Sequence, residues 1–231
     1  MCSTMSSTES ILAIDLGTSR VKVYLYSEDG NLVAQCARSY PSMKEAGGHV
    51  EQSPDDWLQA VLDGIRYIRA TSSGQWPPTI CSLTGQMHGV VLVGADGRLL
   101  RPAIICSDAR AGAELERITE EVGEKYILEV TGNPGLPIFP AAKLLWVRNN
   151  EPDVLRRTGT VLLPKDYLGY LMTDELATEP SDASGTMLYD LGKNRWDERL
   201  CNAAGIRLDV LPEIRPSLEL RGKVSRTFAD L

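Results

Sequence analysis

The chain has 231 residues, 43% of them hydrophobic, and a formal net charge of −7. This length and composition are enough to bury a core in one large domain or two small ones. The acidic balance excludes the basic surface of a nucleic-acid-binding protein. No apolar run reaches the roughly 18 residues of a membrane span, so we expect neither a nucleic-acid nor a membrane partner.

The N-terminal stretch MCSTMSSTES is polar and lacks the apolar core of a signal peptide. We expect residues 1–10 to be a disordered tail. The five cysteines are odd in number, widely spaced and in no C-x-x-C pair. This pattern favours free thiols in a reducing cytosol over disulfides or a zinc site, and so predicts a cytoplasmic protein.

Strands are predicted at 11–15, 21–26 and 31–38, with a hairpin turn at Glu28-Asp29-Gly30. Ser53-Pro54-Asp55-Asp56 begins a helix, whose Trp57 is expected to anchor the core. The apolar stretch 90–93 is expected to pair with the residues after Ala95-Asp96-Gly97. Strands followed by alternating helices and strands predict a mixed α/β sheet. The remaining predictions are a loop at 74–78, strands at 80–84 and 160–163, and helices near 109–122, 140–149, 164–172 and 197–204.

The segment ILAIDLGTSRVK, residues 11–22, has the pattern of a strand, a tight turn of small polar residues and a second strand. Such a turn can hold phosphate oxygens with its backbone, and a carboxylate at its mouth can bind Mg²⁺ directly or through water. It differs from the Gly-rich P-loop, whose GxxxxGK[ST] string is absent here. An ordinary polar hairpin turn could have the same residues. The motif alone therefore does not distinguish a phosphate-binding turn from a hairpin turn without a ligand.

Eight segments in a fixed order make the chain resemble the N-terminal domain of the FGGY family of carbohydrate kinases, and within it the kinases of D-xylulose. The resemblance implies an actin-like, ribonuclease-H-like ATPase fold, a mixed sheet flanked by helices. It also implies ATP and Mg²⁺ as cofactors and a small sugar as substrate. The segments are IDLGTSRVKV (14–23), HVEQSPDDW (49–57), LTGQMHGVVLV (83–93), LRPAIICSDAR (100–110), TGN (131–133), AAKLLWV (141–147), LLPKDYL (162–168) and SDASGTM (181–187).

At the phosphate end, Asp15 is expected to contact metal and phosphate. An unpaired carboxylate at the end of an apolar strand would be costly to bury, and a magnesium role would remove that cost. By resemblance, Gly17, Thr18 and Ser19 would supply backbone N–H and hydroxyl donors to the phosphate. Lys22 is expected to point back towards it. A turn-capping Asp15 and a solvated Lys22 are the structural alternatives.

At the sugar end, the resemblance assigns the pocket to Gln86, Met87 and His88 of the QMHG segment, which would set polar groups beside an apolar wall. His88 has a structural alternative, a hydrogen-bonded core histidine. Asp108 matches a sugar contact, and it also has the pattern of a helix N-cap.

The resemblance adds Asn133 and Asp166 to the sugar pocket. Asp166 has the alternative of capping its own helix. Lys143 and Trp146 lie three apart on a predicted helix and are expected to support the fold, and His49 is also interpreted as structural.

The resemblance places the catalytic base in a Gly-Asp turn, and no glycine of this chain is followed by aspartate. We therefore expect the base to lie beyond Leu231. Residues 11–231 are then expected to be the sugar-binding and phosphate-loop domain, without the C-terminal nucleotide domain and inactive alone. The parent activity would transfer the ATP γ-phosphate to D-xylulose, giving D-xylulose 5-phosphate. A homodimer is compatible with this interpretation.

Three alternatives remain. The first is a kinase of the same family for ribulose, gluconate or glycerol, although glycerol kinases carry an Arg-Glu pair where Met87-His88 stands. The second is a non-catalytic sugar-binding module, and the third an actin-like structural protein.

Overall fold

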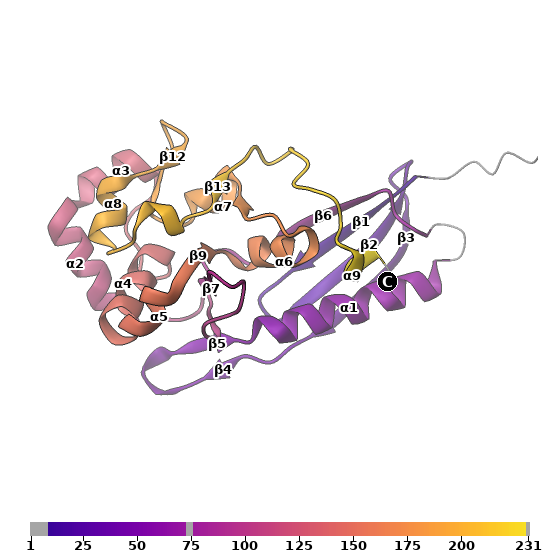
Figure 1. The fold of residues 1–231 in the computed structure, drawn as a ribbon, viewed down its shortest axis with the longest axis horizontal. Helices are drawn as coiled ribbons and strands as arrows, with labels where there is room; N and C mark the ends of the chain where they lie inside the picture. Colours follow the sequence, from indigo (N-terminus) through magenta and orange to yellow (C-terminus); the bar gives the residue numbers. More distant parts are fainter. Residues whose placement is uncertain (1–8, 73–75, 230–231) are drawn as a thin grey trace, which may run out of the picture. The chain divides into compact units, whose positions relative to one another are not determined.

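The computed structural model describes residues 9–72 and 76–229 (Figure 1). The range predicted as one domain divides into two compact units. Unit 1 holds the described residues up to Pro41, Asp55–Gly85 and those from Arg226 onward; unit 2 holds Ser42–Pro54 and Gln86–Ser225. Within the described ranges, no helix combines the length and the apolar character needed to cross a membrane.

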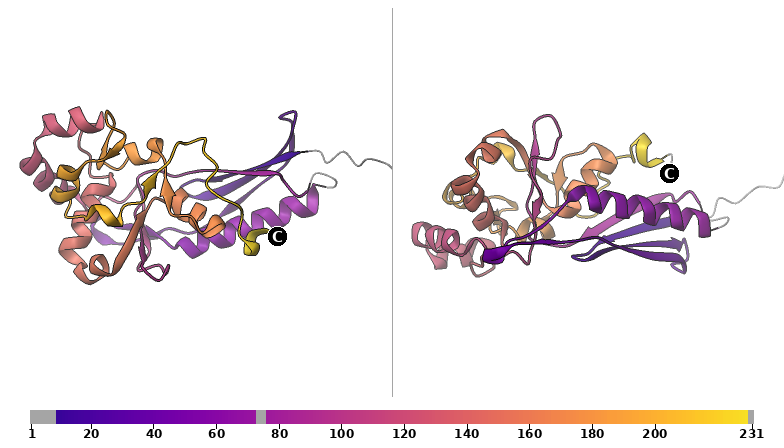
Figure 2. Two further views of the ribbon diagram at one scale, coloured as in Figure 1. Left: turned by 45° about the horizontal axis from the view of Figure 1, so that its top comes forward. Right: turned by 90° about the horizontal axis from the view of Figure 1, so that it is seen from below.

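Unit 1 is a four-stranded sheet in the order β3-β2-β1-β6 with helix α1 (Pro54–Thr71) along one face (Figure 2). Strand β1 pairs antiparallel with β2 and parallel with β6, and β2 pairs antiparallel with β3. The Cys36 thiol donates to the carbonyl oxygen of Gly64 on α1, which ties the helix to the sheet. The strands are β1 (Ser10–Leu16), β2 (Arg20–Ser27), β3 (Leu32–Ser39) and β6 (Ile80–Gly85).

Alternation along β1 and β2 decides which face each side chain occupies. Ile14 and Val23 pair across the two strands and are buried towards α1. Because successive side chains of a strand point to opposite faces, Asp15 and Lys22, the next pair in the register, lie on the other face. The predicted strand pattern therefore places the candidate carboxylate on the face that α1 does not cover.

The four predicted strands and the helix of unit 1 are confirmed, and Trp57 is buried as predicted. Residues 1–8 of the predicted tail and residues 74–75 of the predicted loop lie outside the described residues. The tail prediction extends too far at Ser10, which is buried and begins β1. The short helix α9 (Arg226–Ala229) was not predicted from the sequence.

Unit 2 is built on a hydrophobic core between helices and the antiparallel pair β7 (Val91–Gly94) and β9 (Thr158–Leu162). Leu92, Leu144 and Val161 are among its buried side chains. The helices that contribute to this core are α2 (Gly112–Val122), α3 (Glu124–Thr131), α4 (Pro140–Asn150) and α8 (Glu198–Ala203).

Short elements complete unit 2. Strands β4, β5 and β8 form a three-stranded antiparallel sheet, β10 pairs with β13, and β11 pairs with β12. The strands are β4 (Met43–Lys44), β5 (Val50–Gln52), β8 (Ala103–Ile104), β10 (Ala177–Thr178), β11 (Tyr189–Asp190), β12 (Arg195–Trp196) and β13 (Glu213–Ile214). The helices are α5 (Pro152–Arg157), α6 (Pro164–Thr173) and α7 (Pro180–Ser184), with 3-10 turns η1 (Ala46–Gly48) and η2 (Leu208–Val210).

The prediction that 90–93 pairs with the residues after Gly97 is confirmed by two antiparallel bridges, Val93 to Leu99 and Val90 to Ile104. Strand β7 also pairs with β9, which the sequence did not predict. The helix predictions for unit 2 need correction. Helix α2 begins at Gly112 rather than at 109. Helices α3, α5 and α7, of eight residues or fewer, were missed because so short a helix shows little of the 3.6-residue period.

Candidate active site

The turn after β1 is closed by its own hydrogen bonds. The Gly17 N–H donates to the carbonyl oxygen of Arg20 at 3.1 Å, and a Cβ at Gly17 would lie 3.0 Å from the same oxygen. Thr18 and Ser19 are exposed. Of the three residues predicted to donate to phosphate, Gly17 uses its N–H in a hydrogen bond within the turn, whereas Thr18 and Ser19 are exposed to solvent.

Tyr40, which the sequence did not single out, fastens this turn. Its hydroxyl donates to the carbonyl oxygen of Gly17, and its N–H donates to that of Ser19 at 3.4 Å. Burial raises the pKa of Tyr40, and the nearby charge of Asp15 raises it further, so the hydroxyl stays a donor. A sequence separation of 23 residues gives no local signal for this contact.

Asp15 is not the buried, unpaired carboxylate that the sequence predicted. Its Oδ2 lies 3.2 Å from Nζ of Lys22, and the two side chains are 32% and 44% exposed. The cross-strand register makes the pair, because Asp15 stands directly opposite Lys22. Lys22 is therefore paired with Asp15 rather than only solvated, and its contact with phosphate stays a prediction.

The magnesium expectation fits Asp15 as a single ligand. Mg²⁺ in phosphate-transfer sites is usually held by one or two carboxylates, with phosphates and water as the other ligands. The partly exposed carboxylate of Asp15 beside an exposed polar turn meets that need. No group of three or more His, Cys, Asp or Glu residues suited to a metal occurs in the part of the chain that the structure describes.

His88 is held in a defined orientation. Its backbone has φ of 63°, its Nδ1 lies 2.8 Å from the carbonyl oxygen of Gly185, and its ring meets Phe139 edge-on at 5.0 Å. A carbonyl oxygen only accepts, so Nδ1 carries the proton and the neutral ring presents Nε2 as an acceptor. Burial lowers the pKa of His88, the Gly185 hydrogen bond opposes this, and the charge of Lys143 adds to it.

Two glycines make room for this segment. A Cβ at Gly185 would lie 2.9 Å from both Nδ1 and Cε1 of His88. A Cβ at Gly89 would lie 2.5 Å from Cγ of Pro164, at the start of α6. Met87 is 56% exposed and offers apolar surface next to His88 in the chain. The QMHG segment therefore combines a fixed imidazole with an accessible thioether.

Gln86 is buried, and its Nε2 donates to Oε1 of Gln52 at 2.9 Å. Its own Oε1 is buried without a hydrogen-bond partner among the described residues. Most buried polar groups are hydrogen-bonded, so an unpaired acceptor in a predicted pocket is a candidate contact for a ligand hydroxyl.

The structure brings Asn133 to the segment that holds His88. Its Nδ2 donates to the carbonyl oxygen of Ser184 at 3.3 Å and to that of Thr131 at 3.2 Å. Ser184 precedes Gly185, so Asn133 and His88 bind adjacent carbonyl groups at the end of α7. The amide oxygen of Asn133 is the part of its side chain left for a ligand.

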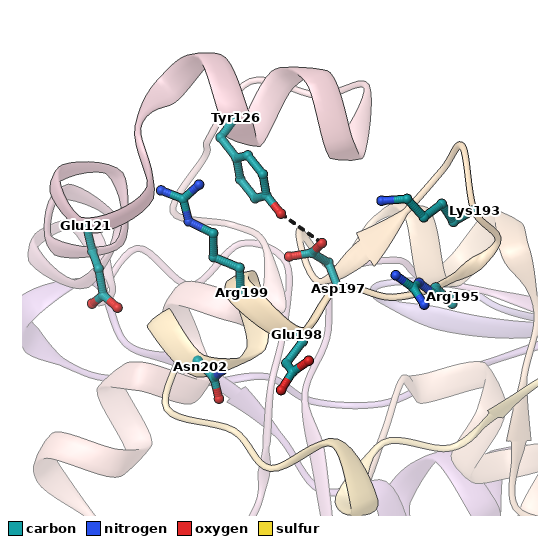
Figure 3. A pocket seen from close by; sticks show the side chains of 8 residues that line it. All are labelled: Glu121, Tyr126, Lys193, Arg195, Asp197, Glu198, Arg199 and Asn202. Carbon is teal, nitrogen blue, oxygen red and sulfur yellow. Dashed lines mark hydrogen bonds between the residues drawn. The ribbon is translucent and has the colours of Figure 1, made fainter.

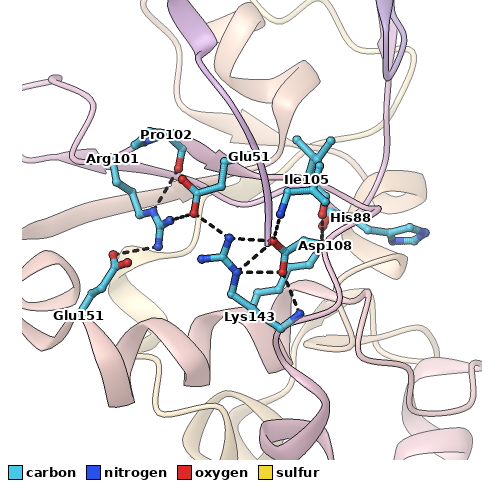
Figure 4. A network of polar contacts seen from close by, with 10 residues as sticks. Glu51, His88, Arg101, Pro102, Ile105, Asp108, Lys143 and Glu151 are labelled. Atoms are coloured by element: carbon cyan, nitrogen blue, oxygen red, sulfur yellow. Dashed lines mark hydrogen bonds and ion pairs between the residues drawn. The ribbon is translucent and has the colours of Figure 1, made fainter. Parts of the chain in front are cut away.

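Asp108 is the centre of a buried ion network (Figure 4). It accepts from the N–H of Val50 at 2.5 Å, and from the N–H, Nε and Nη2 of Arg110 at 2.7–3.0 Å. Burial favours a higher pKa for Asp108, but the hydrogen bonds from Arg110 and Val50 outweigh it, and the pKa is lowered. The N-cap interpretation is wrong, since Ala111 is the N-cap residue of α2. A sugar contact stays a prediction, and it would compete with these bonds.

The network extends around Trp146. Nη2 of Arg110 lies 2.7 Å from Oε1 of Glu51, and Arg101 pairs with both Glu51 and Glu151. The guanidinium of Arg110 lies 4.6 Å from the Trp146 ring centre and that of Arg101 lies 5.9 Å from it. His49 meets the same ring edge-on at 5.5 Å, in line with its structural interpretation. These contacts fix β5 to the loop that carries Asp108.

Lys143 joins the two candidate sugar loops. Its fully buried Nζ donates to the carbonyl oxygens of His88 at 2.7 Å and Ile105 at 2.8 Å (Figure 4). Burial lowers the pKa of Lys143 to about 8, although the charge of Asp108 opposes the shift. The predicted structural role thus acts directly on the backbone of His88.

Asp166 lies in a second buried ion cluster. Its Oδ1 is 2.8 Å from Nζ of Lys165 and 3.3 Å from Nη1 of Arg221. Lys165 also pairs with Asp182 at 3.2 Å and with Glu179 at 3.6 Å. Asp166 does not cap its helix, because Leu163 is the N-cap residue of α6. Burial raises the pKa of Asp182 to about 6, against the charge of Lys165. As a sugar contact, Asp166 stays a prediction.

The catalytic base expected beyond Leu231 stays a prediction. Leu231 itself lies outside the described residues, the last of which is Ala229. The three candidate aspartates that the structure does describe, Asp15, Asp108 and Asp166, are each held in an ion pair. In each of the three, a cationic side chain occupies a carboxylate oxygen that a base would need for the substrate hydroxyl.

An open hollow of about 520 Å³ lies elsewhere in unit 2 (Figure 3). Among its lining residues, Tyr126 donates to Asp197 at 3.0 Å, and the Arg199 guanidinium lies over the Tyr126 ring, 4.3 Å from its centre. It contains none of the predicted site residues.

Comparison with known proteins gives a single family. The model of the FGGY family of carbohydrate kinases, N-terminal domain, matches residues 10–231. The xylulose kinase of Bacillus subtilis (strain 168) is 37% identical over 215 residues, which are 93% of this chain and 43% of that enzyme. The chain thus spans less than half the length of this curated relative.

Solved structures agree. The xylulose kinase from Rhodospirillum rubrum superposes with a TM-score of 0.92 at 27% identity, over 96% of this chain and 46% of that one. The gluconate kinase from Lactobacillus acidophilus superposes with a TM-score of 0.90 at 26% identity, over 96% of this chain and 45% of that one. These likenesses confirm the predicted actin-like α/β fold. With nearly all of its length matched by the family model, the chain belongs to the FGGY family of carbohydrate kinases, in whose N-terminal domain it lies.

Proposed function

We propose that this chain is the sugar-binding and phosphate-turn portion of a kinase that transfers the γ-phosphate of ATP to D-xylulose, giving D-xylulose 5-phosphate. Similarity to xylulose kinases at 37% identity supports the substrate. The observation that carries the proposal is the QMHG segment. In it a buried, unpaired acceptor of Gln86 is followed by the exposed Met87 and by His88 with Nε2 as acceptor. Acceptors beside an apolar surface suit the hydroxyls and carbon chain of a sugar.

The phosphate end supports the same reaction class. Thr18 and Ser19 present exposed polar groups in a turn that Tyr40 fastens. Asp15 would hold Mg²⁺, and Lys22 would share the negative charge of the phosphates. When bound, the metal offsets phosphate charge as that charge shifts during transfer.

Phosphoryl transfer also needs a base to take the proton of the attacking hydroxyl. Asp108 and Asp166 are held in ion pairs within buried networks, and Asp15 is paired with Lys22. None of these three carboxylates is therefore suited to that role. We infer that the chain binds sugar without turning it over.

Two measurements on the same preparation test the proposal. Calorimetry should show binding of D-xylulose in preference to ribulose, gluconate and glycerol. Coupled ADP release with each sugar should stay at the no-sugar level. Binding of gluconate but not D-xylulose would overturn the substrate, and sugar-dependent ADP release would overturn the inferred inactivity. The homodimer and the cytoplasmic location stay predictions.

A further inference from the structure

Three polar side chains form a hydrogen-bonded relay that ends in the QMHG segment. Nε2 of Gln52 donates to Oγ of Ser42 at 2.8 Å, and Nε2 of Gln86 donates to Oε1 of Gln52 at 2.9 Å. Gln52 is fully buried at the end of β5, and Gln86 is 6% exposed. All three residues belong to unit 2.

The relay fixes which atom of Gln86 is left over. The amide nitrogen of Gln52 donates to Ser42, so its amide oxygen faces Gln86. Because that oxygen can only accept a hydrogen bond, Gln86 donates to it with its own amide nitrogen. Oε1 of Gln86 is then the end of the chain of bonds, and it is buried with no partner among the described residues. A buried acceptor without a donor is unfavourable, so a ligand that supplies an O–H group there gains affinity.

We propose that Gln52 is a specificity-determining positioning residue: it orients the Gln86 amide so that Oε1 accepts a hydrogen bond from a sugar hydroxyl. This inference rests on the proposed sugar binding and adds a residue to it. Gln52 does not touch the sugar. It acts through Gln86, and Ser42 in turn sets the direction of Gln52.

A double-mutant cycle on the full chain tests the relay, with D-xylulose affinity measured by calorimetry. Gln52→Met and Gln86→Met should each weaken binding about tenfold, as expected for the loss of one ligand hydrogen bond. The double variant should bind about as weakly as either single variant, because both changes remove the same bond. Gln59→Met, on the exposed side of α1, is the matched control and should bind like the wild type.

Two further variants keep the test decisive if Gln52→Met folds poorly. Gln52→Glu should bind D-xylulose with nearly wild-type affinity, unlike Gln52→Met. Burial should keep the introduced carboxyl group protonated, so that it can donate to Ser42 and accept from Gln86. Ser42→Ala removes one of the hydrogen bonds that direct the Gln52 amide. It should weaken binding severalfold when introduced alone, but not in a Gln86→Met background. A merely structural role of Gln52 predicts neither result.

Each result has one meaning. Multiplicative losses, near one hundredfold in the double variant, or unchanged binding by Gln52→Met, would overturn the relay while leaving the proposed function intact. If the wild type binds another sugar of the panel, the cycle is judged with that sugar and only the substrate is revised. If it binds none, both the sugar binding and the inference fail.

Discussion

Lys143 shows how a single buried charge can serve a site. Its ammonium group donates to two backbone carbonyls and forms no ion pair within the described residues. The desolvation cost of burying this charge is offset by those hydrogen bonds and by the charge of Asp108. One of those carbonyls belongs to His88, whose backbone is in the left-handed region. The buried ammonium group of Lys143 therefore stabilises the left-handed backbone at His88.

The lowered pKa of Lys143 predicts a pH dependence of stability. The unfolded chain keeps the proton up to the ordinary value of 10.5, and the folded chain releases it at about 8. Between these values the unfolded state binds more protons, so the contribution of Lys143 to the free energy of unfolding rises with pH. Urea unfolding from pH 7 to 10 should show this rise in the wild type, by up to about 3 kcal/mol, and not in Lys143→Met.

Lys125→Met, at an exposed position of α3, is the control for this series and should keep the wild-type slope. Parallel pH profiles for the wild type and Lys143→Met would contradict the prediction.

Gly185 is the residue that lets His88 adopt its orientation. The backbone at Gly185 has φ of −81°, which any residue accepts. The His88 ring, 2.9 Å from the place that a Cβ would take, is the closest obstacle to a side chain, followed by the carbonyl oxygen of Asp182 at 3.4 Å. Gly185→Ala should displace the ring and weaken D-xylulose binding about tenfold, the value of one lost hydrogen bond.

The readout for Gly185→Ala is calorimetry together with the ¹⁵N shifts of His88, which report its tautomer. Gly192→Ala, where the nearest contact is an ordinary 3.5 Å, is the control. An unchanged tautomer with weakened binding would mean that His88 is not the route of the effect.

At the scale of elements, α1 and the sheet of unit 1 approach closely at one point. A Cβ at Gly64 would lie 2.6 Å from Cγ2 of Val23, so the helix must carry glycine there despite its low helix propensity. The close packing of α1 buries one face of β1 and β2, and Asp15 lies on the other face of the sheet. The packing of α1 therefore fixes which face of the sheet is left for the candidate phosphate site.

Two glycine substitutions separate packing from propensity. Gly64→Ala gains up to about 1 kcal/mol of helix propensity but overpacks the interface by about 1–3 kcal/mol, so it should destabilise unit 1. Gly112→Ala, in the first turn of α2 with nothing within 4 Å, should instead stabilise by about 0.5–1 kcal/mol. Urea unfolding measures both, and a gain of stability in Gly64→Ala would refute the close approach.

At the scale of the whole molecule, the candidate residues divide between the two units. The turn 17–20, Asp15 and Lys22 belong to unit 1, and the QMHG segment, Asn133 and the buried ion networks belong to unit 2. The residues proposed to contact phosphate thus lie in one unit, and the residues proposed to contact the sugar lie in the other.

This division predicts separate footprints in hydrogen exchange. D-Xylulose should slow amide exchange at 86–89 and 184–188 in unit 2, because ligand contacts stabilise the local structure. ATP with Mg²⁺ should slow exchange at 16–20 in unit 1. Mass spectrometry of the exchanged peptides measures both, and protection of unit 1 by sugar alone would contradict the assignment.

The sequence by itself determined the family, the strand-turn-strand motif and the QMHG segment, because these are local strings of residues with local geometry. It also located every strand of the main sheet, since alternation of buried and exposed residues is written in the chain. It placed Asp15 at the end of β1, but it mistook its environment. Burial and ion pairing depend on which strand lies opposite, and that is Lys22 across the register.

Only the tertiary structure decided the partners of the buried polar groups. Asp108 binds Val50, 58 residues away, and Lys143 binds His88, 55 residues away, so no local pattern marks either contact. The same holds for the contact of Tyr40 with the turn after β1 and for that of Gln52 with Gln86. A hydrogen bond needs two groups within about 3 Å, and only the folded chain brings such distant residues to that distance.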